Sequence, residues 1–359
     1  MRAEICGLVR PEVSSQTLCW ACAQGREQSR FPFSGPERNE IRAYQFMAES
    51  TVEVSSISVV TVLGCGVIGS SWAQAFFANG LRVKAWDPRR ITRELLTVAA
   101  RPYIGVIEFF DSPVDAVTEA QFIQESGPED LNLKRELFSA IAPHISPEAL
   151  VASSTSTLQP SDLQRSSPFA DRILVGHPFN PPHILPLVEV VGGQETSETS
   201  VRKAMAFYRS LGKHPIRLYR ERPGHLANRL QAALWREAID AVTSGQASVE
   251  DVDAAVTLAL GPRWALMGPF ATFHLGGGEG GLAHFLSHLG TAFESLWDDA
   301  RRPIMTEALK LRLIGAIADR FGEHSLAELL AERDQKLKAV LAVAGGVAPP
   351  GSGIETASP

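Results

Sequence analysis

The sequence predicts a doubly wound, mostly parallel α/β sheet followed by an all-helical C-terminal domain. Three observations lead to this prediction. Short β-branched runs alternate with helical stretches from residue 57 to about 218, a glycine-rich turn follows the first of these runs, and strand signals nearly vanish after residues 223–224. Strands that alternate with helices form parallel sheets covered on both faces. The length of 359 residues fits two domains, because single cores rarely grow beyond about 250 to 300 residues.

Each expected strand is a short apolar run bounded by turn residues. The strands are expected at 57–63, 83–86, 122–123, 149–152, 173–175 and 187–191. In the C-terminal half, apolar residues recur with helical spacing at Leu226, Leu230, Leu234, Ala238 and Val242, and Ser248 with Asp251 forms a capping-box signal for the next helix. We therefore expect an appended, poorly ordered segment at 1–55, the α/β domain at 56–218, the helical domain at 219–335 and a flexible tail at 336–359.

Charge and composition exclude several functional classes. With 34 basic and 40 acidic residues, the chain carries a formal net charge of −6, which disfavours nucleic acid and anionic membrane as partners. No stretch approaches the ~18 apolar residues of a membrane-spanning helix. The 4 cysteines are too few for a disulfide framework, and the pair Cys19 and Cys22 has no histidine nearby to complete a metal site. We expect a cytoplasmic protein without a metal.

A dinucleotide-binding motif follows the first expected strand directly. Gly64-Cys65-Gly66-Val67-Ile68-Gly69 leads into a stretch of helical composition, so the glycines stand where a turn must approach a pyrophosphate and pack closely on a helix. Asp87 ends the next strand at about the ~20-residue spacing of an acid that binds the ribose hydroxyls. Such an acid repels a 2′-phosphate and favours NAD, although Arg89 and Arg90 act against this preference. The alternative is an ordinary glycine turn, with Asp87 opening an Asp-Pro turn.

The candidate proton-transfer group is His177. It lies just past an expected strand, at the edge where open α/β sheets bind their ligands, in a proline-bounded loop. Glu189 stands in an apolar run and needs a partner, because a buried lone carboxylate is costly. A carboxylate can orient an imidazole and stabilise its protonated form. The two residues therefore form a candidate dyad, and the alternative is a satisfied core histidine beside a capping glutamate.

Over about residues 57 to 300 the sequence resembles the 3-hydroxyacyl-CoA dehydrogenase superfamily. The resemblance rests on the glycine loop, on Ala152-Ser153-Ser154-Thr155-Ser156, on the run from Gly176-His177-Pro178-Phe179-Asn180-Pro181 to Glu189, and on Asn228. It implies a Rossmann-type NAD-binding domain and a homodimer formed through the helical domain.

The resemblance also implies residue roles. His177 becomes the base for alcohol oxidation and Glu189 orients it, while Ser153 and Asn228 bind or place the substrate oxygen. Glu129 and Lys134 match positions on the cofactor side. For Glu129 and Lys134, the sequence supports an exposed acidic helix start with a nearby lysine equally well.

Within the superfamily, residues 122–126, 176–193, 234–238 and 263–269 resemble the carnitine and gulonate dehydrogenase (lambda-crystallin) branch most. This branch uses free 3-hydroxy acids. Thioester-using relatives carry a longer helical insertion after the ribose-binding acid than this chain has between Asp87 and Phe122. The sequence therefore favours an NAD-dependent L-3-hydroxy acid dehydrogenase with a small-molecule substrate. An acyl-CoA thioester dehydrogenase and a non-catalytic dinucleotide-binding protein remain alternatives.

Overall fold

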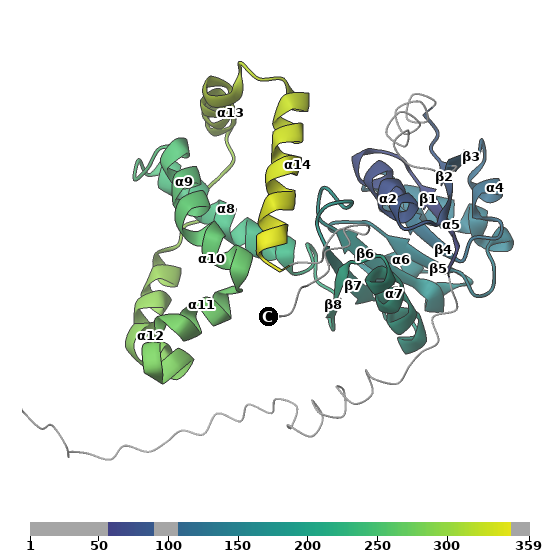
Figure 1. The fold of residues 1–359 in the computed structure, drawn as a ribbon, viewed down its shortest axis with the longest axis horizontal. Helices are drawn as coiled ribbons and strands as arrows, with labels where there is room; N and C mark the ends of the chain where they lie inside the picture. The colour runs from purple at the N-terminus through teal and green to yellow at the C-terminus, as the bar shows by residue number, and fades with distance from the viewer. Residues whose placement is uncertain (1–56, 90–106, 346–359) are drawn as a thin grey trace, which may run out of the picture. The chain divides into compact units, whose positions relative to one another are not determined.

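Eight strands form one sheet in the part of the chain that the computed structural model describes, residues 57–89 and 107–345 (Figure 1). The strands are β1 Val59–Leu63, β2 Arg82–Trp86, β3 Ile107–Phe109, β4 Phe122–Glu125, β5 Leu150–Ser153, β6 Ile173–Pro178, β7 Leu187–Gly192 and β8 His214–Leu218. They lie in the order β3-β2-β1-β4-β5-β6-β7-β8. The pairs are parallel except β6 with β7, which is antiparallel. The strands β1 to β6 follow the Rossmann order, in agreement with the Rossmann-type domain that the resemblance implies.

Two strands, β3 and β8, were not predicted. β3 has three residues, half-buried around a central Glu108, and therefore lacks an apolar run. β8 carries Pro215 near its start, which argues against a central strand. The structure places β8 at the edge of the sheet, where a missing backbone N–H costs nothing.

Helices cover both faces of the sheet, as expected. They are α2 Val67–Ala78, α4 Pro113–Val117, α5 Leu131–Ile141, α6 Pro160–Gln164 and α7 Glu198–Ser210. On one face, α2 and α7 contribute Trp72, Phe76 and Phe207 to a buried core. On the other face, a second core contains Phe138 of α5 and Leu163 of α6. With apolar side chains packed on both sides, the central strands are fixed in position and so are the loops that leave their ends.

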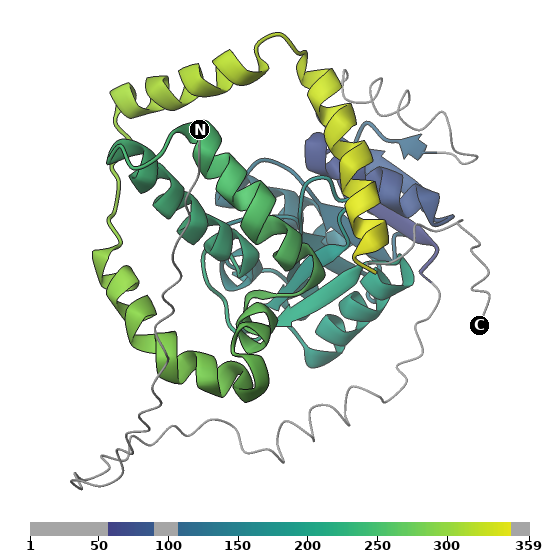
Figure 2. The same ribbon diagram turned by 60° about the vertical axis from the view of Figure 1, so that its left-hand side comes forward.

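Helices alone follow the sheet in the described residues after 219 (Figure 2). They are α8 Ala227–Thr243, α9 Val249–Ala255, α10 Gly261–Leu266, α11 Pro269–Gly276, α12 Gly281–Asp299, α13 Glu307–Phe321 and α14 Leu326–Val343, with a π-helical turn at Val256–Leu260. The predicted capping box is confirmed: the side chain of Ser248 accepts a bond from the backbone N–H of Asp251 at 3.0 Å.

Two expectations about the ends of the chain have different outcomes. The flexible tail expected from residue 336 is wrong for its first part, since α14 continues to Val343. Leu337, Val340 and Leu341 keep helical spacing there, so the Gly-Pro-rich composition that follows is a poor guide to where the helix ends. The segment 1–55, residues 346–359 and residues 90–106 of the short insertion lie outside the described residues.

None of the helices in the described ranges is long and apolar enough to span a membrane. Within the same ranges, no group of three or more His, Cys, Asp or Glu side chains is arranged to hold a metal ion.

Candidate active site

The glycine loop between β1 and α2 leaves open the place where a pyrophosphate would approach. Gly64 has φ +89°, a left-handed conformation that glycine adopts without strain, and a Cβ on Gly69 would lie 1.8 Å from the Gly64 carbonyl oxygen. A Cβ on Gly66 would meet only the end of the Arg89 side chain, at 3.8 Å. No side chain caps the N-terminus of α2, and Val67 is 74% exposed. The loop and its helix dipole therefore fit the pyrophosphate of NAD.

Asp87 lies at the end of β2, beside this loop. Its carboxylate accepts bonds from the backbone N–H of Cys65 at 2.8 Å and of Arg89 at 2.8 Å, and the Arg89 guanidinium approaches it to 3.1 Å. Burial raises the pKa of Asp87, but these hydrogen bonds outweigh burial and hold the pKa below its usual value. An ionised acceptor at this position is suited to ribose hydroxyls. The donors and acceptors present fit NAD, and Arg89 must share Asp87 with the ribose.

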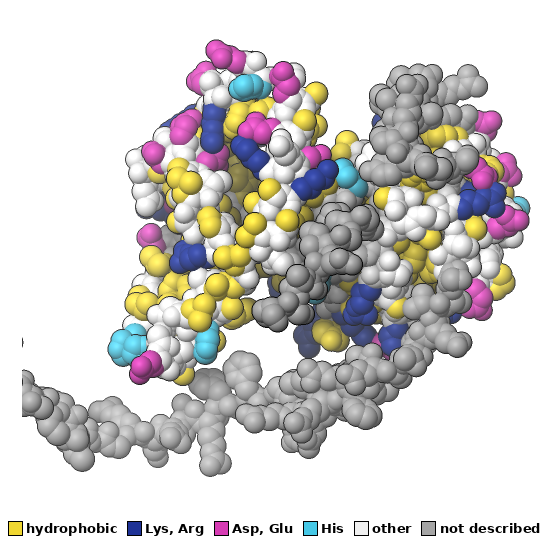
Figure 3. All heavy atoms as spheres, viewed as in Figure 1, with side chains coloured by type: hydrophobic (Ala, Val, Ile, Leu, Met, Phe, Trp, Pro, Cys, Tyr) yellow, Lys and Arg dark blue, Asp and Glu magenta, His cyan; other side chains and the backbone are white. Residues whose placement is uncertain are grey.

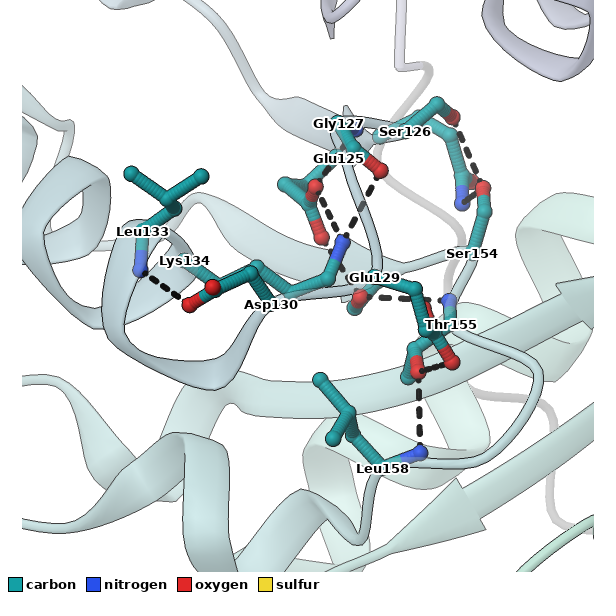
Figure 4. A network of polar contacts seen from close by, with 12 residues as sticks. Glu125, Ser126, Gly127, Glu129, Asp130, Leu133, Lys134, Ser154, Thr155 and Leu158 are labelled. Atoms are coloured by element: carbon teal, nitrogen blue, oxygen red, sulfur yellow. Dashed lines mark hydrogen bonds and ion pairs between the residues drawn. The ribbon is translucent and has the colours of Figure 1, made fainter.

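A buried ion pair lies under the loops that follow β4 and β5 (Figure 4). Lys134 of α5 donates to Glu125 at 2.6 Å, and both side chains are almost fully buried. The Ser153 hydroxyl donates to the other oxygen of Glu125 at 2.5 Å, and the Gly127 N–H donates to the first at 2.6 Å. The Ser153 hydroxyl is thus directed into this network, and the geometry does not support the expected contact of Ser153 with a substrate.

The surroundings of Lys134 correct one of the two interpretations given for Lys134 and Glu129, the exposed helix start with a nearby lysine. Lys134 is 2% exposed, so it is no surface lysine beside a helix start. Glu129 anchors the loop after β5, because its carboxylate accepts bonds from Thr155 Oγ1 at 2.6 Å, Ser156 N at 3.0 Å and Thr157 N at 2.8 Å. Burial raises the pKa of Glu129, but these bonds outweigh it and lower the pKa below its ordinary value. Both residues shape loops on the cofactor edge of the sheet.

His177 and Glu189 lie directly opposite each other on the antiparallel strands β6 and β7. His177 Nδ1 is 2.8 Å from Glu189 Oε2, and both side chains are buried. A carboxylate only accepts hydrogen bonds, so Nδ1 carries the ring proton and Nε2 is left as the basic nitrogen. The structure thus brings this predicted pair together in the geometry that a general base requires.

The start of α8 holds the other oxygen of Glu189. Glu189 Oε1 accepts bonds from the N–H groups of Leu226 at 3.0 Å and Ala227 at 2.8 Å. Burial raises the pKa of Glu189, but the bonds from His177, Ala227 and Leu226 outweigh burial, so the pKa lies below its usual value. Glu189 is therefore an ionised partner for His177. Asn228 follows within the first turn of α8 and is half-buried.

Sequence reasoning missed a second buried histidine in this site. The rings of His225 and His177 have centroids 5.1 Å apart, and His225 is 4% exposed. His225 Nε2 lies 2.9 Å from the Thr155 carbonyl oxygen. The only local signal is its place after Pro223-Gly224, which reads as an ordinary turn, so no pattern separates it from a surface loop residue.

Polar side chains contact the strand that carries His177. Tyr208 of α7 donates to Gln124 at 2.7 Å, and Gln124 donates to Ser154 at 2.8 Å and to the Gly176 carbonyl oxygen at 3.4 Å. A Cβ on Gly176 would lie 2.0 Å from the Tyr208 hydroxyl oxygen, so only glycine fits beside His177.

The loop after His177 is also fixed. Lys213, in the turn between α7 and β8, is buried and donates to the carbonyl oxygens of Pro182 and Leu185. His183 in the same loop bonds to Ser71 of α2 at 2.7 Å. Burial lowers the pKa of Lys213 to about 8.

Comparison with known proteins agrees with this architecture. The family model described as "3-hydroxyacyl-CoA dehydrogenase, NAD binding domain" matches residues 59–222, and the model of the C-terminal domain of the same family matches residues 224–320. The L-carnitine dehydrogenase of Streptomyces coelicolor is 42% identical over 306 residues, which are 81% of this chain and 96% of that protein. The L-carnitine dehydrogenase of Pseudomonas aeruginosa is 42% identical over 302 residues, 80% of this chain and 94% of its own.

Solved structures show the same likeness. A 5-formyl-3-hydroxy-2-methylpyridine 4-carboxylic acid 5-dehydrogenase, described as an NAD+ dependent dismutase, has a TM-score of 0.69 and 27% identity, covering 81% of this chain and 100% of that one. A 3-hydroxyacyl-CoA dehydrogenase from Archaeoglobus fulgidus has a TM-score of 0.59 and 26% identity, covering 80% of this chain and 99% of that one.

Proposed function

Because the chain belongs to the 3-hydroxyacyl-CoA dehydrogenase family, we propose that it interconverts an L-3-hydroxy acid and its 3-oxo form with NAD, using His177 and Glu189. The observation that carries the proposal is the buried pair itself. His177 Nδ1 faces Glu189 at 2.8 Å, and the first N–H groups of α8 hold the carboxylate from its other side.

The proton of the reacting hydroxyl passes to His177 Nε2 in the oxidation. NAD, when bound, supplies the acceptor for the hydride that leaves the same carbon. The ring then carries two protons and a positive charge, which Glu189 stabilises across the 2.8 Å contact. In the reverse direction His177 returns the proton to the oxygen of the carbonyl group.

The other predicted residues have separate roles in this proposal. Asn228 orients the substrate oxygen from the first turn of α8. Gly64, Gly66, Gly69 and the N-terminus of α2, with Val67 and Ile68, receive the pyrophosphate, and Asp87 receives the ribose. Ser153 acts through Glu125 and Lys134, which together with Glu129 fix the loops at the cofactor edge.

The substrate class follows from the relatives. The two relatives that are 42% identical to this chain are named L-carnitine dehydrogenases and are about as long as the matched part of this chain. We therefore propose a free L-3-hydroxy acid, carnitine-like or gulonate-like. The family name itself favours a second candidate, a 3-hydroxyacyl-CoA thioester.

The test is NAD reduction by the purified full-length protein with L-carnitine, L-gulonate, L-3-hydroxybutyrate and 3-hydroxybutyryl-CoA. Turnover of a free acid supports the proposal, and turnover of the thioester alone overturns the substrate class. A His177→Ala variant is the matched control, because it must bind NAD as the wild type does while losing turnover. If it keeps nearly full turnover, the assignment of the base is wrong.

We also propose that the helical domain forms a homodimer in the cytoplasm. Large apolar side chains on it are exposed, among them Trp235 at 59%, Phe270 at 78% and Trp297 at 68%. Figure 3 shows hydrophobic side chains gathered over α10 to α12. Contiguous exposed apolar surface of this kind is typical of an interface. Sedimentation that gives only monomer at micromolar concentration would contradict this part of the proposal.

A further inference from the structure

Lys213 carries a positive charge inside the protein without a negative partner. It lies in the turn between α7 and β8, and its side chain is buried. Among the described residues no carboxylate forms an ion pair with it, and its ammonium group lies over the ring of Trp72, 5.9 Å from the centroid. A methionine would fill similar space without the desolvation cost of a charge. Packing alone therefore does not account for this residue.

The ammonium group binds the loop between β6 and β7. Its Nζ donates to the carbonyl oxygens of Pro182 and, at 3.2 Å, of Leu185. Hydrogen bonds from a charged donor are stronger than those between neutral groups. The same stretch of the loop forms a turn, because the N–H groups of Ile184 and Leu185 donate to the Pro181 carbonyl oxygen at 3.0 and 2.9 Å. Lys213 thus attaches this turn to the α/β domain.

The same loop lies between the base and the helix of the cofactor site. At its start, the rings of Phe179 and His177 meet edge to face, with centroids 5.0 Å apart. In its middle, the His183 N–H donates to the Ser71 hydroxyl of α2 at 2.9 Å, and His183 Nδ1 lies 2.7 Å from the same oxygen. A hydroxy acid that gives its proton to His177 and its hydride to NAD must be held in line with both. The loop therefore borders the substrate side of the site.

We propose that Lys213 is a positioning residue for the dehydrogenase reaction: through two backbone carbonyl oxygens it holds the loop 179–186 in the conformation that binds the hydroxy acid. The inference rests on the proposed function and adds to it a residue that acts through the loop. Without these bonds the free enzyme loses the ordered loop, and substrate binding must restore it. His177 and Glu189 are held by the strand register and by α8, so proton transfer in the bound complex is unaffected.

The kinetic test compares Lys213→Met with Lys203→Met in the full-length protein. Lys203 of α7 forms an exposed ion pair with Glu148 at 3.2 Å, so the same change there is the matched control. In Lys213→Met, KM for L-carnitine, or for whichever compound named above is oxidised fastest, should rise about tenfold, the lower end of the contribution of a bond from a charged donor. The kcat should change by less than about threefold, because a loss of binding shared by substrate and transition state raises KM alone. Lys203→Met should match the wild type.

Hydrogen exchange measures the loop itself, in the absence of substrate. Peptides that cover residues 179–186 should exchange at least about tenfold faster in Lys213→Met than in the wild type, because their amides lose local protection. Peptides from β6 and β7, and the affinity for NAD in calorimetry, should not change. Lys213→Gln keeps N–H donors without the charge and should lie between the wild type and Lys213→Met in both measurements. It decides the test if Lys213→Met does not fold.

Three results overturn the inference. The first is a KM within about threefold of the wild type in folded Lys213→Met. The second is a loop that exchanges in the variant as it does in the wild type. The third is a fall in kcat with an unchanged KM, because Lys213 would then act on the dyad. If the wild type oxidises none of the compounds, the proposed function fails, and the exchange measurement still decides whether Lys213 holds the loop.

Discussion

Replacing Glu189 by glutamine reverses the direction of one hydrogen bond and changes little else. The amide oxygen can take the place of Oε1, which accepts from Leu226 and Ala227 at 3.0 and 2.8 Å. The amide nitrogen then occupies the position 2.8 Å from His177 Nδ1 and donates to it. The ring proton must therefore move to Nε2, the nitrogen that should accept the substrate proton. The amide also cannot stabilise a protonated ring as a carboxylate does.

We expect Glu189→Gln to lower kcat by about 10⁴-fold, the loss seen when an orienting carboxylate is made an amide in a hydrolase triad. This corresponds to about 5.5 kcal/mol in the activation free energy. KM, NAD affinity and the midpoint of thermal unfolding should change little, because shape and backbone bonds persist.

The assay is NAD reduction at saturating substrate, with calorimetric NAD binding and thermal unfolding as controls for folding. A kcat within tenfold of the wild type, in a folded variant that binds NAD, would refute the reasoning. Glu189 would then support the start of α8 without governing proton transfer at His177.

Three further predictions concern stability. Lys134→Met leaves a buried carboxylate unpaired and should lower the free energy of unfolding by about 3 to 5 kcal/mol in urea titrations, whereas the same change at Lys310, in an exposed ion pair, should cost at most about 1 kcal/mol. Gly176→Ala should cost about 1 to 3 kcal/mol through its clash with the Tyr208 hydroxyl, and Tyr208→Phe in the same chain should restore part of this loss. Between pH 8 and 10.5 the unfolded chain holds a proton that native Lys213 has lost, so stability should rise with pH by up to about 3 kcal/mol relative to Lys213→Met.

Each has a result that contradicts it. Equal losses for the variants at Lys134 and Lys310 would mean that burial does not strengthen the first ion pair. Additive losses at Gly176 and Tyr208 would mean that the two do not collide. If the difference in the free energy of unfolding between wild type and Lys213→Met does not change with pH, the pKa of native Lys213 is not lowered.

The sequence predicts those parts of the site that residues close together in the chain form. The glycine loop, Asp87 and the strand ends are local signals, because a turn near a phosphate needs glycines in a short window. His177 and Glu189 are 12 residues apart in the chain, yet a short loop between two strands brings them together, so a local reading finds them as well.

The parts that depend on strand register were not predictable. Ser153 faces Glu125 because β4 and β5 pair these two residues directly, and no feature of either segment alone gives that pairing. Lys134 reads as a surface residue until α5 packs its face against the sheet. His225 carries no local signal, since its importance comes from Thr155, 70 residues away in the chain.

The pairing of His177 with Glu189 on β6 and β7 means that the sheet sets the distance between the two side chains. Residues opposite each other in an antiparallel pair keep their spacing for as long as the register holds, whatever the length of the connecting loop. Insertions or deletions between Phe179 and Pro186 can therefore reshape the substrate side without moving the acid–base pair. A shift of the register by one residue would separate His177 from Glu189. The loop can therefore vary among relatives and in engineered variants, whereas the pairing of the two strands cannot change without loss of the dyad.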